Sequence, residues 1–229
     1  MTSVTSSREE CLRLVTASHP DAVPLAVQAL IAGEVVAIPT DTVYGLAAAI
    51  DRPDAIDRLF ALKGRPVDKA VPVLLSDPVH LPQVTTDLSM AAARLALSFW
   101  PGALTLVLPA LPHLPSRLTS ISEDGRKTVA VRVPDHPVAR AIIEAAGGAL
   151  AVTSANRSGE APALEARDAA AFGASSPILV IDGGRVSVGV PSTIVLAAAE
   201  PPLILREGAI SGSAIAAALA ERQTAAARS

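Results

Sequence analysis

Short apolar runs rich in valine, leucine and isoleucine alternate along the chain with longer amphipathic stretches. Runs of the first kind predict buried strands, whereas apolar residues spaced three and four apart predict helices. We expect strands at 35–38, 71–75, 104–110, 128–134, 149–154, 177–184, 192–198 and 203–208. We expect helices at 22–32, 55–63, 87–99, 137–146 and 213–223. Because several strands follow one another without an intervening helix, the pattern predicts a mixed rather than a strictly parallel α/β sheet.

Residues at the helix ends carry start and stop signals. Asp21 can cap the first helix, and Gly33 can end it. Asp54 is placed to start the second helix, and Asp87 or Thr86 to cap the third. These signals fix where the predicted helices begin.

The organisation predicted from this pattern is one α/β domain over residues 11–223, with flexible tails at 1–10 and 224–229. The sequence shows no repeat and no linker. Its longest predicted connection, 109–127, reads PALPHLPSRLTSISEDGRK and is rich in turn-forming residues. Loops of this length are often lids or binding loops.

Composition narrows the class of protein. Half of the 229 residues are hydrophobic and 18% are charged, which excludes a disordered chain and predicts a substantial core. The net charge of −3 gives no general attraction to nucleic acid. The one cysteine, Cys11, excludes an intramolecular disulfide and a CxxC metal site. No apolar run reaches about 18 residues and no signal peptide is seen, so we expect a cytoplasmic protein without a membrane partner.

Most familiar catalytic motifs are absent from the sequence. It contains no GxxxxGK[ST], no GxGxxG after a strand, no HExxH and no GxSxG. The four histidines are scattered, at His19, His80, His113 and His136. We therefore expect no metal site built by the protein.

Polar side chains follow the first predicted strand at once. Thr40, Asp41 and Thr42 come directly after VVAI and Pro39. Such residues can cap a helix, or they can offer hydroxyls and free backbone N–H groups to a polar ligand. The sequence leaves both interpretations open.

The segment KGRPVDK, residues 63–69, holds two of the three lysines of the chain, Lys63 and Lys69. Lys63 and Arg65 flank one glycine, and in an extended segment they point to the same side. Two converging cations suit a polyphosphate. The alternative is a solvated basic turn at a helix C-terminus, where cations also interact well with the helix dipole.

A third polar cluster, TSANRSG, follows the apolar run ALAV. Ser154 and Asn156 have the same two-residue spacing, and their side chains can bind phosphate oxygens or a ribose. The alternative is a local Asx or Ser turn. Further single candidates are Thr128, Arg132, Ser192 and Arg206.

Together these clusters resemble a known family. The segments IPTDTVYGL, LKGRP, WPGALTLVL, VAVRVPDHPVA, TSANRSG, PSTIV and LREGAI occur in the order found in the YrdC/Sua5 threonylcarbamoyl-AMP synthases. The likeness runs from about residue 24 to 212, and its signature combines the KxR and SxN pairs. The resemblance implies a single YrdC-like catalytic domain, in which helices flank a twisted open mixed sheet around a positively charged cavity.

The resemblance also implies an activity. The family makes L-threonylcarbamoyl-AMP from L-threonine, bicarbonate and ATP with release of pyrophosphate, the first step of N6-threonylcarbamoyladenosine formation in tRNA. Mg²⁺ is expected with ATP, bound mainly through phosphates and water. The expected partners are downstream threonylcarbamoyl transferase proteins and, through them, tRNA.

Site residues follow from the matching motifs. The resemblance implies that Lys63 and Arg65 are catalytic. It implies an ATP-binding set of Lys63, Arg65, Lys69, Thr128, Ser154, Asn156 and Arg206. It implies a threonine-binding set of Thr42, Arg132, Val152 and Ser192, with Arg132 on the carboxylate. The chain departs from the pattern at KAVPVLL, where Leu74 replaces a histidine that lines the threonine site in some members.

Two other functions can be weighed against this one. A non-catalytic module of the same fold could bind double-stranded RNA through Arg65, Arg126, Lys127 and Arg132, although the net charge and the lack of a basic stripe oppose this. A related carbamoyl-transfer domain occurs in hydrogenase maturation factors. Those factors carry zinc-binding cysteine motifs, which a single cysteine cannot form.

Overall fold

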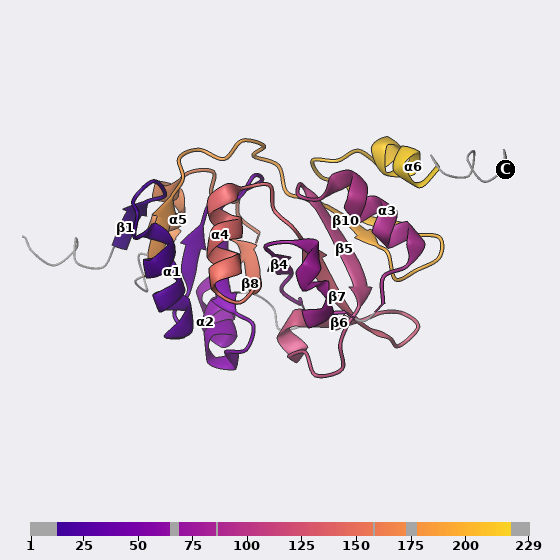
Figure 1. The fold of residues 1–229 in the computed structure, drawn as a ribbon, viewed down its shortest axis with the longest axis horizontal. Coiled ribbons are helices and arrows are strands. Elements are labelled where there is room, and N and C mark those ends of the chain that lie inside the picture. The colour runs from indigo at the N-terminus through magenta and orange to yellow at the C-terminus, as the bar shows by residue number, and fades with distance from the viewer. Residues whose placement is uncertain (1–12, 65–68, 86, 158, 173–177, 221–229) are drawn as a thin grey trace, which may run out of the picture.

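The computed structural model describes residues 13–64, 69–85, 87–157, 159–172 and 178–220. A mixed sheet runs through this part of the chain, with helices packed along it (Figure 1). The predicted tails at 1–10 and 224–229, as well as Arg65 and Thr86, lie outside the described residues.

The strands of the described part form one sheet. They are β1 (Arg13–Thr16), β2 (Val36–Ile38), β3 (Gly45–Ala49), β4 (Val73–Leu75), β5 (Leu104–Pro109), β6 (Thr119–Ile121), β7 (Lys127–Arg132), β8 (Ala149–Ser154), β9 (Leu179–Asp182), β10 (Thr193–Leu196) and β11 (Leu203–Arg206). Their order is β1-β9-β2-β3-β8-β4-β7-β5-β10-β11, and β6 pairs with β7. Strands β1, β2, β4 and β10 each make a parallel pairing, and the remaining pairings are antiparallel, so the predicted mixed sheet is confirmed.

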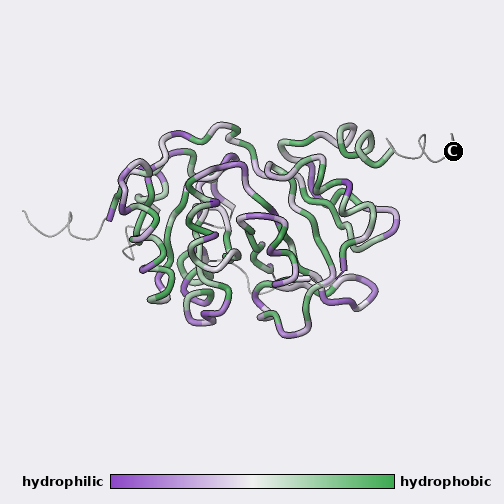
Figure 2. The backbone as a smooth tube through the Cα atoms, viewed as in Figure 1, coloured by the Kyte–Doolittle hydropathy of each residue, from purple (hydrophilic) through white to green (hydrophobic). Residues whose placement is uncertain are grey.

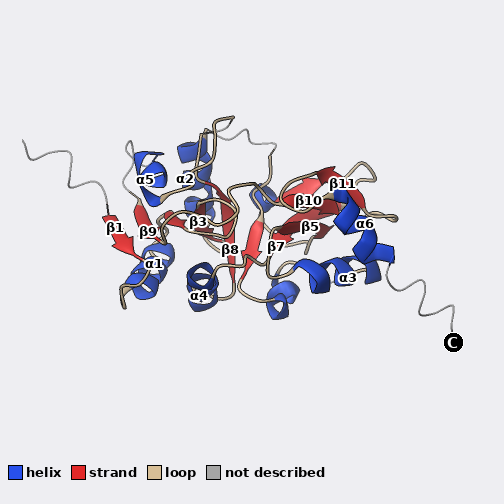
Figure 3. Cartoon of the chain, turned by 90° about the horizontal axis from the view of Figure 1, so that it is seen from above, coloured by secondary structure: helices blue, strands red, loops and turns tan. Residues whose placement is uncertain are grey.

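Helices cover both faces of the sheet (Figure 3). They are α1 (Ala22–Ile31), α2 (Pro53–Lys63), α3 (Met90–Phe99), α4 (Pro137–Ala145), α5 (Ala166–Phe172) and α6 (Gly212–Ala220), with 3-10 turns η1 (Pro78–Gln83) and η2 (Ser116–Leu118). Helices α1 and α4 pack on one face, and α2, α3, α5 and α6 belong to the hydrophobic cluster of the other. Because the sheet twists, α3 is seen on the same side of Figure 3 as α1 and α4.

Several predicted boundaries need correction. The third helix begins at Met90 rather than 87, because Ser89 Oγ accepts the amide of Ala92 at 3.1 Å. Asp87 instead lies in a turn held by Thr85 Oγ1, which accepts its amide. Asp21 occupies the cap position of α1, but its side chain makes no capping hydrogen bond. The second helix begins at Pro53, with Asp54 in its first turn.

Four elements were missed from the sequence: β1, β3, β6 and α5. Strand β3 reads GLAAA, and glycine and alanine have low strand propensity. The predicted long loop at 109–127 contains η2 and β6, so part of it forms regular structure. The C-terminal helix spans Gly212–Ala220, and the predicted residues 221–223 lie outside the described part.

The hydrophobic core fills the space between the sheet and the helices. The strands run mostly through apolar segments, while the connecting loops are more hydrophilic (Figure 2). Tyr44 is fully buried, and its hydroxyl donates to the Gly184 carbonyl at 2.8 Å. Burial raises the pKa of Tyr44 to about 12, so the hydroxyl remains a donor at neutral pH. Among the described helices, none is long and apolar enough to cross a membrane.

The turn from α4 into β8 requires glycine. Gly147 and Gly148 have φ angles of +106° and +91°. A Cβ added to Gly148 would lie 2.3 Å from His80 Nδ1, whereas one added to Gly147 would meet nothing within 4 Å. The two glycines therefore differ in packing and share the same backbone requirement.

We expect Gly148→Ala to destabilise the protein more than Gly147→Ala. Both changes carry backbone strain of roughly 1–3 kcal/mol. Gly148→Ala adds an overpacking cost of about 1–3 kcal/mol against the His80 ring. Urea unfolding of both variants and the parent measures the difference, and equal losses for the two variants would contradict the predicted clash.

Candidate active site

A cavity of about 900 Å³ opens on one face of the sheet, at the end that α1 and α4 do not cover. The side chains of β7 point alternately into this cavity and into the hydrophobic core on the other face of the sheet. Thr128, Ala130 and Arg132 line the cavity, while Val129 and Val131 are buried in the core. The same alternation brings side chains of β5, β10 and β11 to the cavity wall. The two-residue periodicity of these strands thus places the lining side chains on the cavity face.

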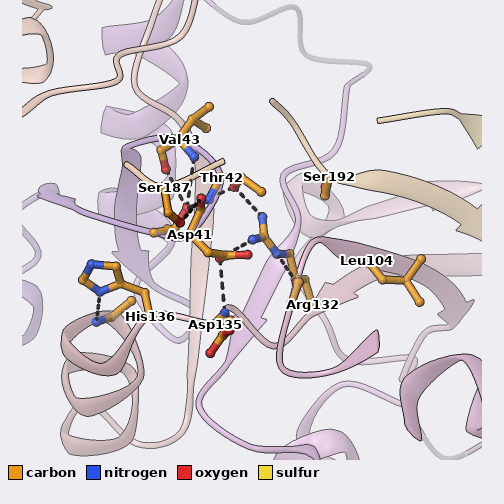
Figure 4. Close-up of polar contacts among 12 residues, drawn as sticks. Asp41, Thr42, Val43, Leu104, Arg132, Asp135, His136, Ser187 and Ser192 are labelled. Atoms are coloured by element: carbon orange, nitrogen blue, oxygen red, sulfur yellow. Dashed lines mark hydrogen bonds and ion pairs between the residues drawn. The ribbon is translucent and has the colours of Figure 1, made fainter. Parts of the chain in front are cut away.

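Arg132 is the buried cation of this cavity (Figure 4). Its guanidinium donates from Nε to the Gly102 carbonyl at 2.8 Å and from Nη1 to Thr42 Oγ1 at 2.8 Å. Its Nη2 donates to Asp41 Oδ1 in an ion pair whose two side chains are each 7% exposed. Burial lowers the pKa of Arg132, and Asp41 opposes that shift. The guanidinium is therefore held at a fixed angle at the cavity wall.

The loop Thr40–Asp41–Thr42 connects β2 to β3 and is fastened by its own hydrogen bonds. Thr40 Oγ1 donates to the Val43 carbonyl at 2.6 Å and lies 3.1 Å from Thr42 Oγ1. The carbonyl of Asp41 accepts the amide of Val188 at 2.9 Å. These residues cap no described helix. They form a tight loop that faces the cavity through Thr40 and Thr42.

Ser192 precedes β10 and lines the same cavity as Thr42 (Figure 4). Its Oγ lies 2.8 Å from Thr105 Oγ1, and both side chains are buried. Arg206 reaches the same segment, because its Nη2 donates to the Ser192 carbonyl at 2.7 Å. Burial lowers the pKa of Arg206, whose side chain also lines the cavity.

Lys63 and the loop after β8 form a second polar centre. The Nζ of Lys63 lies within 3.1 Å of four oxygens, two from Ser154 and two from Asn156. Ser154 Oγ also donates to Asn156 Oδ1 at 2.6 Å. Ser154 and Asn156 line the cavity, whereas Lys63 is 4% exposed and lies behind them. The structure thus brings together three of the four residues in the predicted KxR and SxN pairs.

Only some of the other predicted site residues line the cavity. Val152 and Thr128 are buried and line the cavity, and Leu74 lies on the same wall. Lys69 is exposed and is not one of the described residues that line the cavity. Arg65 lies outside the described residues.

The charge of the lining differs from the expected positive cavity. Of the described lining residues, Arg126, Arg132 and Arg206 are cationic, and Glu123, Asp124 and Glu160 are anionic. The formal charges cancel in this part of the wall, but their depths differ. Arg132 is buried, whereas all three carboxylates are exposed at the rim. In the described part of the chain, no group of three or more His, Cys, Asp or Glu side chains is placed to hold a metal ion.

Residues 28–208 match the model of the Sua5/YciO/YrdC family, which is described as "Telomere recombination". The match covers most of the chain. The chain belongs to the Sua5/YciO/YrdC family.

Two relatives of this chain are named as enzymes. A threonylcarbamoyl-AMP synthase of Bacillus subtilis is 40% identical over 187 residues, which cover 81% of this chain and 53% of the relative. A threonylcarbamoyl-AMP synthase of Pyrococcus abyssi is 38% identical over 178 residues, which cover 78% of this chain and 51% of the relative. The chain therefore spans about half the length of these two relatives.

Solved structures of the Sua5/YciO/YrdC family confirm the predicted fold. The crystal structure of P. abyssi Sua5 complexed with L-threonine has a TM-score of 0.83 and 33% sequence identity. That similarity covers 92% of this chain and 61% of the P. abyssi chain. The twisted mixed sheet with flanking helices is thus the architecture of this family.

Two polar residues of this Sua5/YciO/YrdC chain were given no role from the sequence. Asp41 lies within PTDT, and its ion pair with Arg132 links two segments 91 positions apart. Thr105 lies in the apolar strand LTLVLP, where a buried hydroxyl was the available signal. Both depend on long-range contacts, which sequence spacing does not reveal.

Proposed function

We propose that this chain synthesises L-threonylcarbamoyl-AMP from L-threonine, bicarbonate and ATP, with release of pyrophosphate. The observation that carries the proposal is one cavity that joins a buried, fixed guanidinium to a polar loop held by a lysine. The first group suits a carboxylate, and the second suits phosphates. The names of the relatives and the threonine complex of P. abyssi Sua5 support the same substrates.

At the amino-acid end, we assign the substrate carboxylate to Arg132. A guanidinium can hold a carboxylate through two parallel hydrogen bonds. Thr42 and Ser192 then offer hydroxyls to the other polar groups of threonine. Val152 and Leu74 supply the apolar wall beside its methyl group.

At the nucleotide end, we assign the phosphates to Ser154 and Asn156, which face the cavity. Lys63 supports them from behind and places its positive charge next to them. Thr128 on β7 and Arg206 on β11 line the cavity and are assigned to ATP as well. The family resemblance adds Lys69 and Arg65 to this assignment. In this assignment Ser154 and Asn156 contact the phosphates, while Lys63 holds these two residues in place and adds a positive charge next to them.

The reaction needs no protein nucleophile. The amine of threonine and bicarbonate form a carbamate with loss of water, and a carbamate oxygen attacks the α-phosphorus of ATP in line. Pyrophosphate is the leaving group. Catalysis then rests on positioning and on stabilising charge at the phosphates, which the fixed groups of the cavity can supply. The Mg²⁺ that accompanies ATP would be bound through phosphates and water, and no step is assigned to a metal held by the protein.

The product would pass to a threonylcarbamoyl transferase and then to adenosine in tRNA. The deciding experiment measures pyrophosphate release with ATP and bicarbonate, with and without L-threonine. Threonine-dependent release supports the proposal. Threonine-independent or absent release overturns it, and salt-sensitive retention on double-stranded RNA would then favour the RNA-binding alternative.

Replacing Ser154 or Asn156 with alanine should affect ATP more than threonine. Each variant loses a cavity-facing hydrogen-bonding group, and we expect the KM for ATP to rise by about tenfold, from a loss of about 1–2 kcal/mol per hydrogen bond. Substrate titrations of both variants check this. A lower melting temperature with unchanged kinetics would show instead that the two residues form a purely structural turn.

A further inference from the structure

Asp41 is a buried carboxylate that contacts the site without lining the cavity. It is 5% exposed and follows a loop residue, Thr40, that does face the cavity. Its Oδ1 accepts from Nη2 of Arg132 and from the amide of Asp135 at 3.2 Å (Figure 4). It therefore cannot reach a substrate directly, but it contacts the residue assigned to the carboxylate.

The backbone around Asp41 is itself fixed. Its carbonyl accepts the amide of Val188 at 2.9 Å and the hydroxyl of Ser187 at 3.1 Å. The carbonyl of Thr42 accepts the amide of Gly189 at 2.9 Å. The backbone of Asp41 is thus held by the segment 187–189, and its carboxylate by the amide of Asp135 and by Arg132.

The pairing leaves Arg132 with a defined set of free donors. A guanidinium has five N–H groups in a fixed plane. Three are directed to Gly102, Thr42 and Asp41. These three contacts fix the orientation of the two remaining N–H groups. The direction from which Arg132 can bind a ligand therefore depends on Asp41.

We propose that Asp41 is a positioning residue, which orients the Arg132 guanidinium so that its remaining N–H groups receive the carboxylate of the amino-acid substrate. This inference rests on the proposed function and assigns a determinant of amino-acid affinity within the same cavity. Asp41 also neutralises the charge of Arg132, so the pocket selects a carboxylate by hydrogen-bond direction more than by net charge.

The test compares Asp41→Asn, Asp41→Glu and Asp135→Asn with the parent protein. Asparagine keeps an acceptor and removes the charge, and glutamate keeps the charge and displaces it by one methylene. Asp135→Asn is the matched control, because it removes one charge from an exposed side chain nearby and keeps the amide that Asp41 accepts. KM values for threonine and for ATP are measured by pyrophosphate release, and threonine binding is measured by calorimetry.

Both Asp41 variants should raise the KM and the Kd for threonine by about tenfold or more, as losses of partners that orient a binding group do at metal sites. The KM for ATP should stay within about twofold of the parent, and Asp135→Asn should match the parent in both. Because KM does not depend on the amount of folded enzyme, the comparison holds even for a destabilised variant. An unselective rise for both substrates, or an unchanged KM for threonine, overturns the inference.

A double variant isolates the route through Arg132. If Asp41 acts through Arg132, adding Asp41→Asn to Arg132→Lys should raise the KM for threonine little further, whereas independent effects would multiply. A parent that neither binds threonine nor releases pyrophosphate overturns the proposed function, and this inference with it. A parent that does both, with Asp41 variants that behave like it, overturns this inference alone.

Discussion

Lys63→Ala is expected to reduce the turnover number by about 10²–10³-fold, which corresponds to about 3–4 kcal/mol of lost transition-state stabilisation. The variant removes a positive charge that lies directly behind Ser154 and Asn156. It also removes the donor that holds both of these residues in the loop after β8. We therefore expect kcat to fall and the KM for ATP to rise, while the KM for threonine changes little.

Lys127→Ala provides the matched control for Lys63→Ala. The Nζ of Lys127 also donates to two carbonyl oxygens, of Pro112 and Leu114, at 2.9 and 2.8 Å. It is absent from the described residues that line the cavity. Pyrophosphate-release kinetics and melting temperatures are measured for both variants. They distinguish the general effect of removing a hydrogen-bonded lysine from the specific effect of removing the lysine next to Ser154 and Asn156. Near-parent turnover in a folded Lys63→Ala protein would remove Lys63 from the mechanism.

Arg132→Lys should raise the KM for threonine by about 10- to 100-fold, from about 1.5–3 kcal/mol for hydrogen bonds to a charged group. Lysine keeps the charge, but it cannot reproduce the planar set of donors that spans Gly102, Thr42 and Asp41. Nucleotide affinity should stay close to that of the parent, since Arg132 is assigned to the amino acid.

Threonine titrations at saturating ATP and bicarbonate decide the role of Arg132. Arg140→Lys is a suitable control, because Arg140 Nε donates to the Ser76 carbonyl at 2.7 Å and neither residue lines the cavity. Superimposable threonine saturation curves for Arg132→Lys and the parent would sink the carboxylate assignment.

Much of the fold could be predicted because its signals are local. The strand TVAVRV alternates strictly, and the structure places Thr128 and Arg132 on one face and Val129 and Val131 on the other. Strand β3 could not be predicted from its own residues. Its glycine is favoured by packing: a Cβ on Gly45 would lie 2.5 Å from Val152 Cγ1, so close strand contact favours a glycine there.

The sequence predicted which residues belong to the site better than it predicted how these residues contact one another. The sequence and its family resemblance pointed to Arg132, Thr42 and Ser192, and the structure places all three on one cavity. The sequence suggested that Lys63 faces the ligand, whereas the structure sets it behind Ser154 and Asn156. That difference arises from how the C-terminal end of α2 packs against the loop after β8, which local spacing does not determine.

Strand β9 occupies a position in the sheet that constrains how the molecule is made. It lies between β1 and β2, and Leu179 pairs with both Arg13 and Val36. The first strands to leave the ribosome thus wait for a partner that is synthesised late, with unpaired edges exposed in the meantime. Such long-range closure slows folding. A nascent chain that stalls before residue 179 should therefore be a client for chaperones.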